Sequence, residues 1–316
     1  MSLRRLVTRQ RRRWAIVTSA PGGQAGAQWG DTWFAHDLAE ALEELGEAVR
    51  VVARGGATAP ARDEDDVIVV LRGLRAVQPR RAPGRRQAWL QWVISHPELV
   101  DPGELTAYDA VFAASTSWAP SGADVEPLLQ ATNPRRFRPD AARADSGEAV
   151  LFVGSTRGVR RPIVEGALAC GAELGVYGVG WETLLPTDVL RGSFLPNREL
   201  PAAYAAAGIV LNDHWPDMAA NGFLSNRLFD AVACAARVVS DPAVGLDEVF
   251  GDSVRVVDRP EDLTSLLSPD GHRRFLARDE RLAAAKRVAR EHSFVARAAV
   301  LRDRAVAVLD RQRRAR

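Results

Sequence analysis

Short apolar runs alternate with amphipathic segments along the chain, a pattern typical of strands and crossover helices in a parallel sheet. Between the first two runs, Trp33, Leu38 and Leu42 fall on one face of a helix predicted over 31–45, which Gly46 ends. Six such strands are enough for a complete Rossmann-like domain. The strands predicted in this half are 14–18, 49–53, 67–71, 88–94, 110–114 and 125–129.

The pattern restarts after a polar segment that contains Pro134 and Pro139 and has no apolar period. Pro162 can open the first helix of the second half, because its missing N–H costs nothing in a first turn. Strands are predicted at 150–153, 174–177, 209–212, 238–240 and 254–257, and further helices near 198–207, 226–235 and 261–267.

The predicted fold class is therefore α/β, with two Rossmann-like, doubly wound parallel-sheet domains facing a cleft. We expect an N-terminal domain over 1–133, a linker over 134–148 and a C-terminal domain over 149–290. Residues 274–313 have a helical period with a break near His292 and Ser293. The helix after this break, in 291–316, is expected to pack back on the first domain.

Composition narrows the class of protein. The chain has 316 residues, 47% of them hydrophobic, and a net charge of only +2, so binding to nucleic acid is not indicated. Arginines gather at both ends, either as solvated tails or as a weak peripheral contact with an anionic membrane. Cys170 and Cys234 lie in apolar helix-like stretches, which argues against a disulfide framework. Without an apolar run of about 18 residues or a signal peptide, a cytoplasmic protein is expected.

A Gly-bracketed turn after the strand at 150–153 is the first candidate anion site. Gly154 and Ser155 are followed by Arg157, Arg160 and Arg161 at the start of a helix. Backbone amides, the helix dipole and guanidinium groups together suit a diphosphate. The alternative is that these arginines are only solvated.

A second candidate lies between the strand at 209–212 and the next helix. Asn221 and Gly222 stand in a polar loop, and Ser225 or Asn226 caps a helix whose free N–H groups point back to the cleft. One turn later, Asp230 could accept hydrogen bonds from ribose hydroxyls, or it is a surface acid favoured by the helix dipole.

The segment 212–241, with its Asn-Gly-Phe-x-Ser-Asn-Arg-Leu-Phe-Asp core, resembles the donor-binding region of group 1 (family 4-like) glycosyltransferases of the GT-B fold. It is similar in particular to the spore-coat maturation branch. The resemblance implies that Arg157, Arg160 or Arg161 holds the donor diphosphate, together with Gly154, Ser155, Ser225 and Asn226. It also implies donor-sugar and ribose contacts by Asn221, Gly222, Phe223, Leu224 and Asp230, and base contacts by Phe194 and Leu195.

The chain departs from that family at two acidic positions. Common members carry two glutamates, whereas this chain has Asn221 at the first place and Asp230 near the second. The difference leaves the identity of the sugar open.

The first half offers acceptor-side candidates. Gly22, Gly23 and Trp29 belong to a glycine-rich loop after the first strand, which ends at Asp31, a candidate catalytic residue. His96 follows another strand end, where it could hydrogen-bond the sugar or take the acceptor proton, or be a structural histidine before a turn.

Other histidines are weaker candidates. His214 lies beside Asp213 and Trp215, and His36, His272 and His292 are interpreted as surface or helix residues.

Other chemistries find less support. The acidic run 63–66 contains an Asp-x-Asp spacing used elsewhere for a divalent metal, but a solvated turn is favoured, and no zinc spacing is present. The loop 22–30 does not match the dinucleotide fingerprint, although Arg54 leaves an NADP enzyme open. Trp29, Trp33 and other tryptophans of the first half suit either an aromatic acceptor surface or a core.

The predicted function is transfer of a sugar from a nucleoside-diphosphate donor, needing neither cofactor nor metal. The expected acceptor is a small-molecule or natural-product hydroxyl, a glycan or a lipid-linked acceptor. The resemblance implies retention at the anomeric carbon. The alternatives are a nucleotide-sugar epimerase or hydrolase on the same fold, and a catalytically silent sugar-nucleotide-binding partner.

Overall fold

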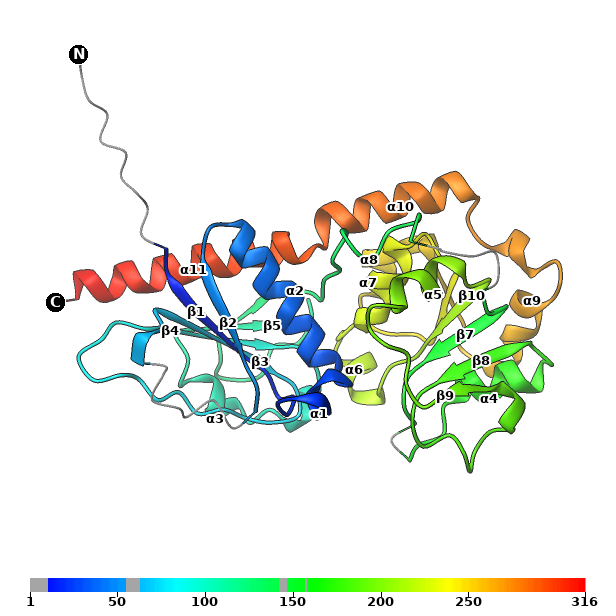
Figure 1. Ribbon diagram of the computed structural model, residues 1–316, viewed down its shortest axis with the longest axis horizontal. Coiled ribbons are helices and arrows are strands. Elements are labelled where there is room, and N and C mark those ends of the chain that lie inside the picture. Colours follow the sequence, from blue (N-terminus) through cyan, green and yellow to red (C-terminus); the bar gives the residue numbers. More distant parts are fainter. Residues whose placement is uncertain (1–10, 55–62, 142–146, 157, 316) are drawn as a thin grey trace, which may run out of the picture.

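The computed structural model describes residues 11–54, 63–141, 147–156 and 158–315, and the chain forms two lobes side by side (Figure 1). The first lobe is built on a sheet whose strands are β1 (Arg13–Val17), β2 (Ala48–Val52), β3 (Val67–Arg72), β4 (Ala88–Val93), β5 (Ala110–Ala113) and β6 (Val125–Pro127). These strands are all parallel and lie in the order β2-β1-β3-β4-β5-β6. Its helices are α1 (Gln24–Ala27), α2 (Gly30–Glu44), the 3-10 helix η3 (Pro97–Leu99) and α3 (Pro102–Leu105).

The second lobe contains a second six-stranded parallel sheet. Its strands are β7 (Val150–Val153), β8 (Leu174–Tyr177), β9 (Leu190–Gly192), β10 (Ile209–Asn212), β11 (Val238–Ser240) and β12 (Val254–Val256). The order is β12-β11-β10-β7-β8-β9, which is the dinucleotide-binding order with its reversal between β7 and β10. The predicted fold class is thus confirmed, and only β9, a short edge strand without an apolar period, was not predicted.

Helices cover both faces of the second sheet and then run back toward the first lobe. Those after β7 are α4 (Pro162–Ala169), α5 (Leu200–Ala206), α6 (Pro216–Ala220), α7 (Asn226–Ala233), α8 (Leu246–Phe250), α9 (Leu263–Leu267), α10 (Arg278–Glu291) and α11 (Phe294–Arg314). Four 3-10 helices are η4 (Thr187–Val189), η5 (Gly251–Ser253), η6 (Pro260–Asp262) and η7 (Gly271–Arg274). Among the described residues, no helix combines the length and apolarity needed to cross a membrane.

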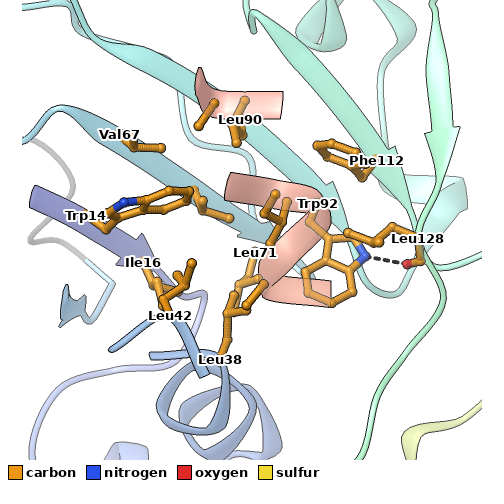
Figure 2. Packing of buried hydrophobic residues seen from close by; sticks show 14 of the residues in the cluster. Trp14, Ile16, Leu38, Leu42, Val67, Leu71, Leu90, Trp92, Phe112 and Leu128 are labelled. Carbon is orange, nitrogen blue, oxygen red and sulfur yellow. Dashed lines mark hydrogen bonds between the residues drawn. The ribbon is translucent and has the colours of Figure 1, made fainter. Parts of the chain in front are cut away.

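The core of the first lobe lies between its sheet and two helices. Trp14 and Ile16 of β1 meet Leu38 of α2, and the buried indole N–H of Trp92 donates to the Leu128 carbonyl at 2.7 Å (Figure 2). The same core includes five residues of the C-terminal helix α11: Phe294, Ala298, Leu301, Ala305 and Val308. The first sheet is therefore completed by the last helix of the chain.

The chain crosses between lobes at the junction of α10 and α11. α10 lies over the second lobe and α11 over the first (Figure 1). Thr132 pairs here with the tail: its N–H donates to the His292 carbonyl at 2.8 Å, and its carbonyl accepts from the Phe294 N–H at 3.0 Å. Arg297, only 8% exposed, donates to the Leu129 and Gln130 carbonyls. The tail is thus fixed to the segment that leaves β6.

The two lobes also share packed side chains. Met218 and Phe223, from the segment after β10, belong to the cluster that contains Trp89 and Val111 of the first sheet. Phe223 is fully buried and meets the Trp118 ring edge-on, with centroids 5.6 Å apart. The segment 216–223 therefore packs against the first lobe.

The acidic run 63–66 is only in part the solvated turn that we predicted. Asp65 is 2% exposed and forms an ion pair with Arg50 at 2.6 Å. Asp66 accepts from the Arg13 N–H at 2.8 Å. Partners on β1 and β2 hold these carboxylates against the sheet, so they have a structural role.

Candidate functional site

The carboxyl ends of β7 and β8 meet in a very close backbone contact at the second lobe's reversal point. Gly178 has φ +149°, and a Cβ built there would lie 2.3 Å from the Gly154 carbonyl oxygen. The Gly154 N–H in turn donates to the Tyr177 carbonyl at 2.8 Å. Glycine at 178 thus allows the two turns to close the floor of a cleft.

The N-terminus of α7 faces the same place and is held by a buried histidine. The Ser225 N–H donates to His214 Nε2 at 3.0 Å, and His214 Nδ1 lies 2.6 Å from an Asp241 carboxylate oxygen. Because Nε2 accepts, Nδ1 carries the proton and donates to Asp241. The His214 side chain is fully buried. We assign this weaker candidate an orienting role for the first turn of α7.

Arg227, in that first turn, is a cation that sequence reasoning did not single out. Its guanidinium donates to the Val153 carbonyl at 2.6 Å and to the Asn212 side-chain oxygen at 3.1 Å, and lies 4.8 Å from the Phe152 ring centroid. A cation near a helix N-terminus opposes the helix dipole. That unfavourable placement was available in the sequence, and it would suit a bound anion.

Asp230 lies one turn further along α7, at the bottom of the cleft. One carboxylate oxygen accepts from the Thr132 hydroxyl at 2.7 Å and the other from the Asn226 amide at 2.8 Å. The side chain comes from the second lobe and Thr132 from the end of the first, so the contact joins them. Burial raises the pKa of Asp230 well above its ordinary value, and the hydrogen bond from Thr132 opposes that shift.

These groups border one cleft of about 420 Å³ between the lobes, a size that suits a bound small molecule. The second lobe contributes turn residues and α7, and the first lobe contributes the start of α2 and the end of β4. Members from the first lobe are Gln28, Gly30, Asp31, Trp33, Phe34, Asp37, Ile94, Ser95 and Gln130. Members from the second include Val153, Gly154, Ser155, Tyr177, Gly178, Ser193, Phe194, Leu195, Asn197, Tyr204, Ser225, Asn226, Arg227 and Asp230.

The structure brings eight of the predicted site residues to this cleft. Phe194 is 38% exposed, whereas Leu195 beside it is nearly buried, so Phe194 offers the free ring face. The eight are Asp31, Gly154, Ser155, Phe194, Leu195, Ser225, Asn226 and Asp230.

The predicted diphosphate arginines occupy other positions. Arg157 lies outside the described residues. Arg160 is exposed and forms an ion pair with Glu165 at 2.8 Å, and Arg161 is paired with Asp213 at 2.7 Å. Arg227, whose Nη1 lies 3.8 Å from the same Asp213, is the arginine that borders the described cleft.

The predicted sugar-contacting loop is largely packed away. The side chains of Phe223 and Leu224 are buried in two hydrophobic cores. The Asn221 carbonyl accepts from the Ser115 hydroxyl at 2.6 Å, and a Cβ at Gly222 (φ +71°) would lie 2.7 Å from the Ser117 hydroxyl. These residues join the lobes, so side-chain contacts of Phe223 and Leu224 with a donor are not supported.

The acceptor-side candidates divide in a similar way. Gly22 and Gly23 are exposed, and Trp29 lies under the Arg54 guanidinium at 5.8 Å, beside the cleft rather than in its lining. His96, also outside that lining, has its Nδ1 3.0 Å from a Glu98 oxygen.

A polar network ties the lobes together at the rim of the cleft. Arg136 binds both oxygens of Asp37, at 2.9 and 3.0 Å, and donates to the Asn197 carbonyl at 3.2 Å. Burial raises the pKa of Asp37, and the Arg136 charge opposes that rise. Residue 136 falls in the predicted linker, which therefore also makes specific contacts with both lobes.

Comparison with known proteins supports a glycosyltransferase relationship. Residues 160–303, which include α7 and the Arg227 region, match a family described as "Glycosyl transferase-like". No curated protein matches the sequence.

Solved structures share the fold over nearly the whole chain. AviGT4, a glycosyltransferase involved in avilamycin A biosynthesis, is 18% identical with a TM-score of 0.66, over 95% of this chain and 98% of that one. Sucrose-phosphate synthase from Thermosynechococcus elongatus is 15% identical with a TM-score of 0.63, over 96% and 100%. The T4 phage enzyme BGT, solved with UDP-glucose, is 12% identical with a TM-score of 0.61, over 94% and 99%. These likenesses show the GT-B fold.

Proposed function

We propose that this protein transfers a sugar from a nucleoside-diphosphate donor, a uridine diphosphate sugar in the first instance, to an acceptor hydroxyl. The observation that carries the proposal is Arg227 in the first turn of α7, at the reversal point of a dinucleotide-type sheet. Similar folds have been solved with UDP-glucose, or with UDP and glucose. We retain the similarity to the spore-coat maturation branch as a prediction.

In this proposal the diphosphate binds at the first turn of α7. The amides of Asn226 and Arg227 and the Arg227 guanidinium stabilise the negative charge that develops on the leaving group. A fixed cation and a helix terminus supply that stabilisation without a metal. The base lies against Phe194, and the ribose near Asp230, whose oxygens then exchange a protein contact for a sugar hydroxyl.

The acceptor approaches from the first lobe. Asp31 and Asp37 both border the cleft from that side. Because Asp37 is paired with Arg136, Asp31 is the proposed catalytic group for the acceptor proton. A small-molecule hydroxyl is the first acceptor class to test, since a similarly folded enzyme acts in avilamycin A biosynthesis. Retention at the anomeric carbon remains a prediction from the family resemblance.

A thermal-shift panel of nucleoside diphosphates and nucleotide sugars is the first test. A ligand that binds only the folded state at 100 times its Kd adds about 2.7 kcal/mol to the free energy of unfolding. We expect one nucleotide to raise the Tm of the wild type, and Arg227→Ala to lose most of that shift.

The matched control is Arg273→Ala, which removes an exposed arginine far along the same lobe and should keep the full shift. If the nucleotide raises the Tm of Arg227→Ala and Arg273→Ala equally, Arg227 does not bind the diphosphate. With the nucleotide identified, donor loss without an acceptor indicates a hydrolase, and binding without turnover on any acceptor indicates a silent partner.

A further inference from the structure

Three ligating side chains from both lobes converge beside α6. His96 and Glu98 follow β4 in the first lobe, and Asp217 lies in α6, which is seen between the lobes in Figure 1. A ring nitrogen of His96 and one carboxylate oxygen from each acid all lie within 4.8 Å of one another. Among the described residues, no other three histidine, cysteine, aspartate or glutamate side chains bring their ligand atoms this close together.

No neighbouring described residue donates to the Asp217 oxygen at the contact between the two acids. Oδ2 of Asp217 is buried and accepts no hydrogen bond from any residue that the structure describes. Glu98 is held by His96 at 3.0 Å but brings only acceptor oxygens to Asp217. Two carboxylates that approach across a boundary between lobes repel each other unless a positive group lies between them or they share a proton.

We propose that His96, Glu98 and Asp217 bind one divalent transition-metal ion, of the Zn²⁺ or Mn²⁺ type. One imidazole and two carboxylates suit these ions, and water completes the coordination. Metal–ligand bonds of about 2.1 Å place neighbouring ligand atoms about 3 to 3.5 Å apart. The three side chains reach that spacing by closing slightly, without a change of fold.

The ion has a role different from that of the donor site. None of the three ligands belongs to the lining of the described cleft, although Ser95, next to His96, does. A metal here links the loop after β4 to α6 and so stabilises the arrangement of the lobes. The inference stands independently of the proposed sugar transfer, which needs no metal at this place.

The test uses full-length protein without a polyhistidine tag, dialysed against EDTA and then against metal-free buffer. Mn²⁺ is added in steps while the electron paramagnetic resonance signal of the free ion is measured, and Zn²⁺ binding is measured by calorimetry. We expect one ion per chain and a rise in Tm with metal. Asp217→Asn and Glu98→Gln keep the side-chain shape and should weaken binding about tenfold or more.

His36→Ala removes an exposed histidine elsewhere in the first lobe and should bind like the wild type. Circular dichroism shows whether each variant is folded before metal is added. If folded wild type binds neither ion, or if Asp217→Asn and Glu98→Gln bind as tightly as His36→Ala, the metal site is wrong and the two carboxyls share a proton instead.

Discussion

The site contains residues that could be predicted from the sequence and residues that could not. Ser225, Asn226 and Asp230 could be predicted because helix caps and strand ends have recognisable patterns, and the structure brings all three to the cleft. Arg160 and Arg161 were chosen for their charge at a helix start and from the family resemblance, and neither reveals the partners Glu165 and Asp213. Ion pairing depends on contacts made in three dimensions.

His292 should make the protein less stable in mild acid. Burial and the neighbouring Arg297 lower its pKa to about 4 from 6.5, and Arg297 donates to its Nδ1 at 2.7 Å. Between these pH values the unfolded chain takes up a proton that the folded protein does not, so stability falls as the pH falls. At pH 5.5 the loss is about 1 kcal/mol or less, after allowing for solvent screening.

Denaturant unfolding of the wild type and of His292→Asn at pH 7.5 and 5.5 measures this effect. The asparagine oxygen keeps an acceptor for Arg297 but does not titrate, so the variant should lose less stability between the two pH values. His36→Asn, at an exposed site, should follow the wild type. Parallel losses in all three proteins would rule out His292 as the source.

At the scale of elements, most helices and strands could be predicted because buried parallel strands are nearly continuous apolar runs. β9 could not, since its three residues Leu190–Gly192 depend on pairing with β8. α6 was taken for loop because its five residues Pro216–Ala220 are too few to show a helical period. Its packing with the first lobe is likewise invisible in the sequence.

The contact between the β7 and β8 turns should tolerate no side chain. In Gly178→Ala the new Cβ must displace the Gly154 carbonyl, so we expect a loss of about 2 to 3 kcal/mol in unfolding free energy and weaker nucleotide binding. Gly171→Ala is the matched control, because Gly171 has φ +70° but open space around it, and should cost about 1 to 2 kcal/mol without affecting binding. Calorimetric Tm values and nucleotide titrations are measured for both variants. If Gly178→Ala and Gly171→Ala lose the same stability and bind nucleotide equally well, backbone strain alone explains the loss.

At the scale of the whole molecule, two sheets facing a cleft were predictable from the restarted strand pattern. The ties between the lobes were not, because Arg136 and Thr132 stand in a polar stretch with no period. Their partners Asp37, Asn197 and Asp230 are distant in the sequence. The segment that the sequence predicts to be a linker therefore also makes contacts between the lobes.

Removing Arg136 should loosen the lobes. Arg136→Ala leaves Asp37 buried without its cation, which should cost about 3 kcal/mol and increase the radius of gyration measured by solution scattering. Arg135→Ala removes the neighbouring, 61% exposed arginine, whose pairs with Glu40 and Glu44 should be worth about 1 kcal/mol or less. An unchanged scattering curve for Arg136→Ala would show that the other interlobe contacts, such as those of Thr132 and Phe223, hold the lobes without it.

The position of α11 also has a consequence for biosynthesis. The ribosome makes the first sheet early, yet five residues of the helix over 294–314, made after the whole second lobe, complete its core. Until this helix emerges, one face of that sheet exposes apolar surface. The exposed surface favours aggregation during this interval, so we expect a truncation within this helix to destabilise the half of the protein that was translated first.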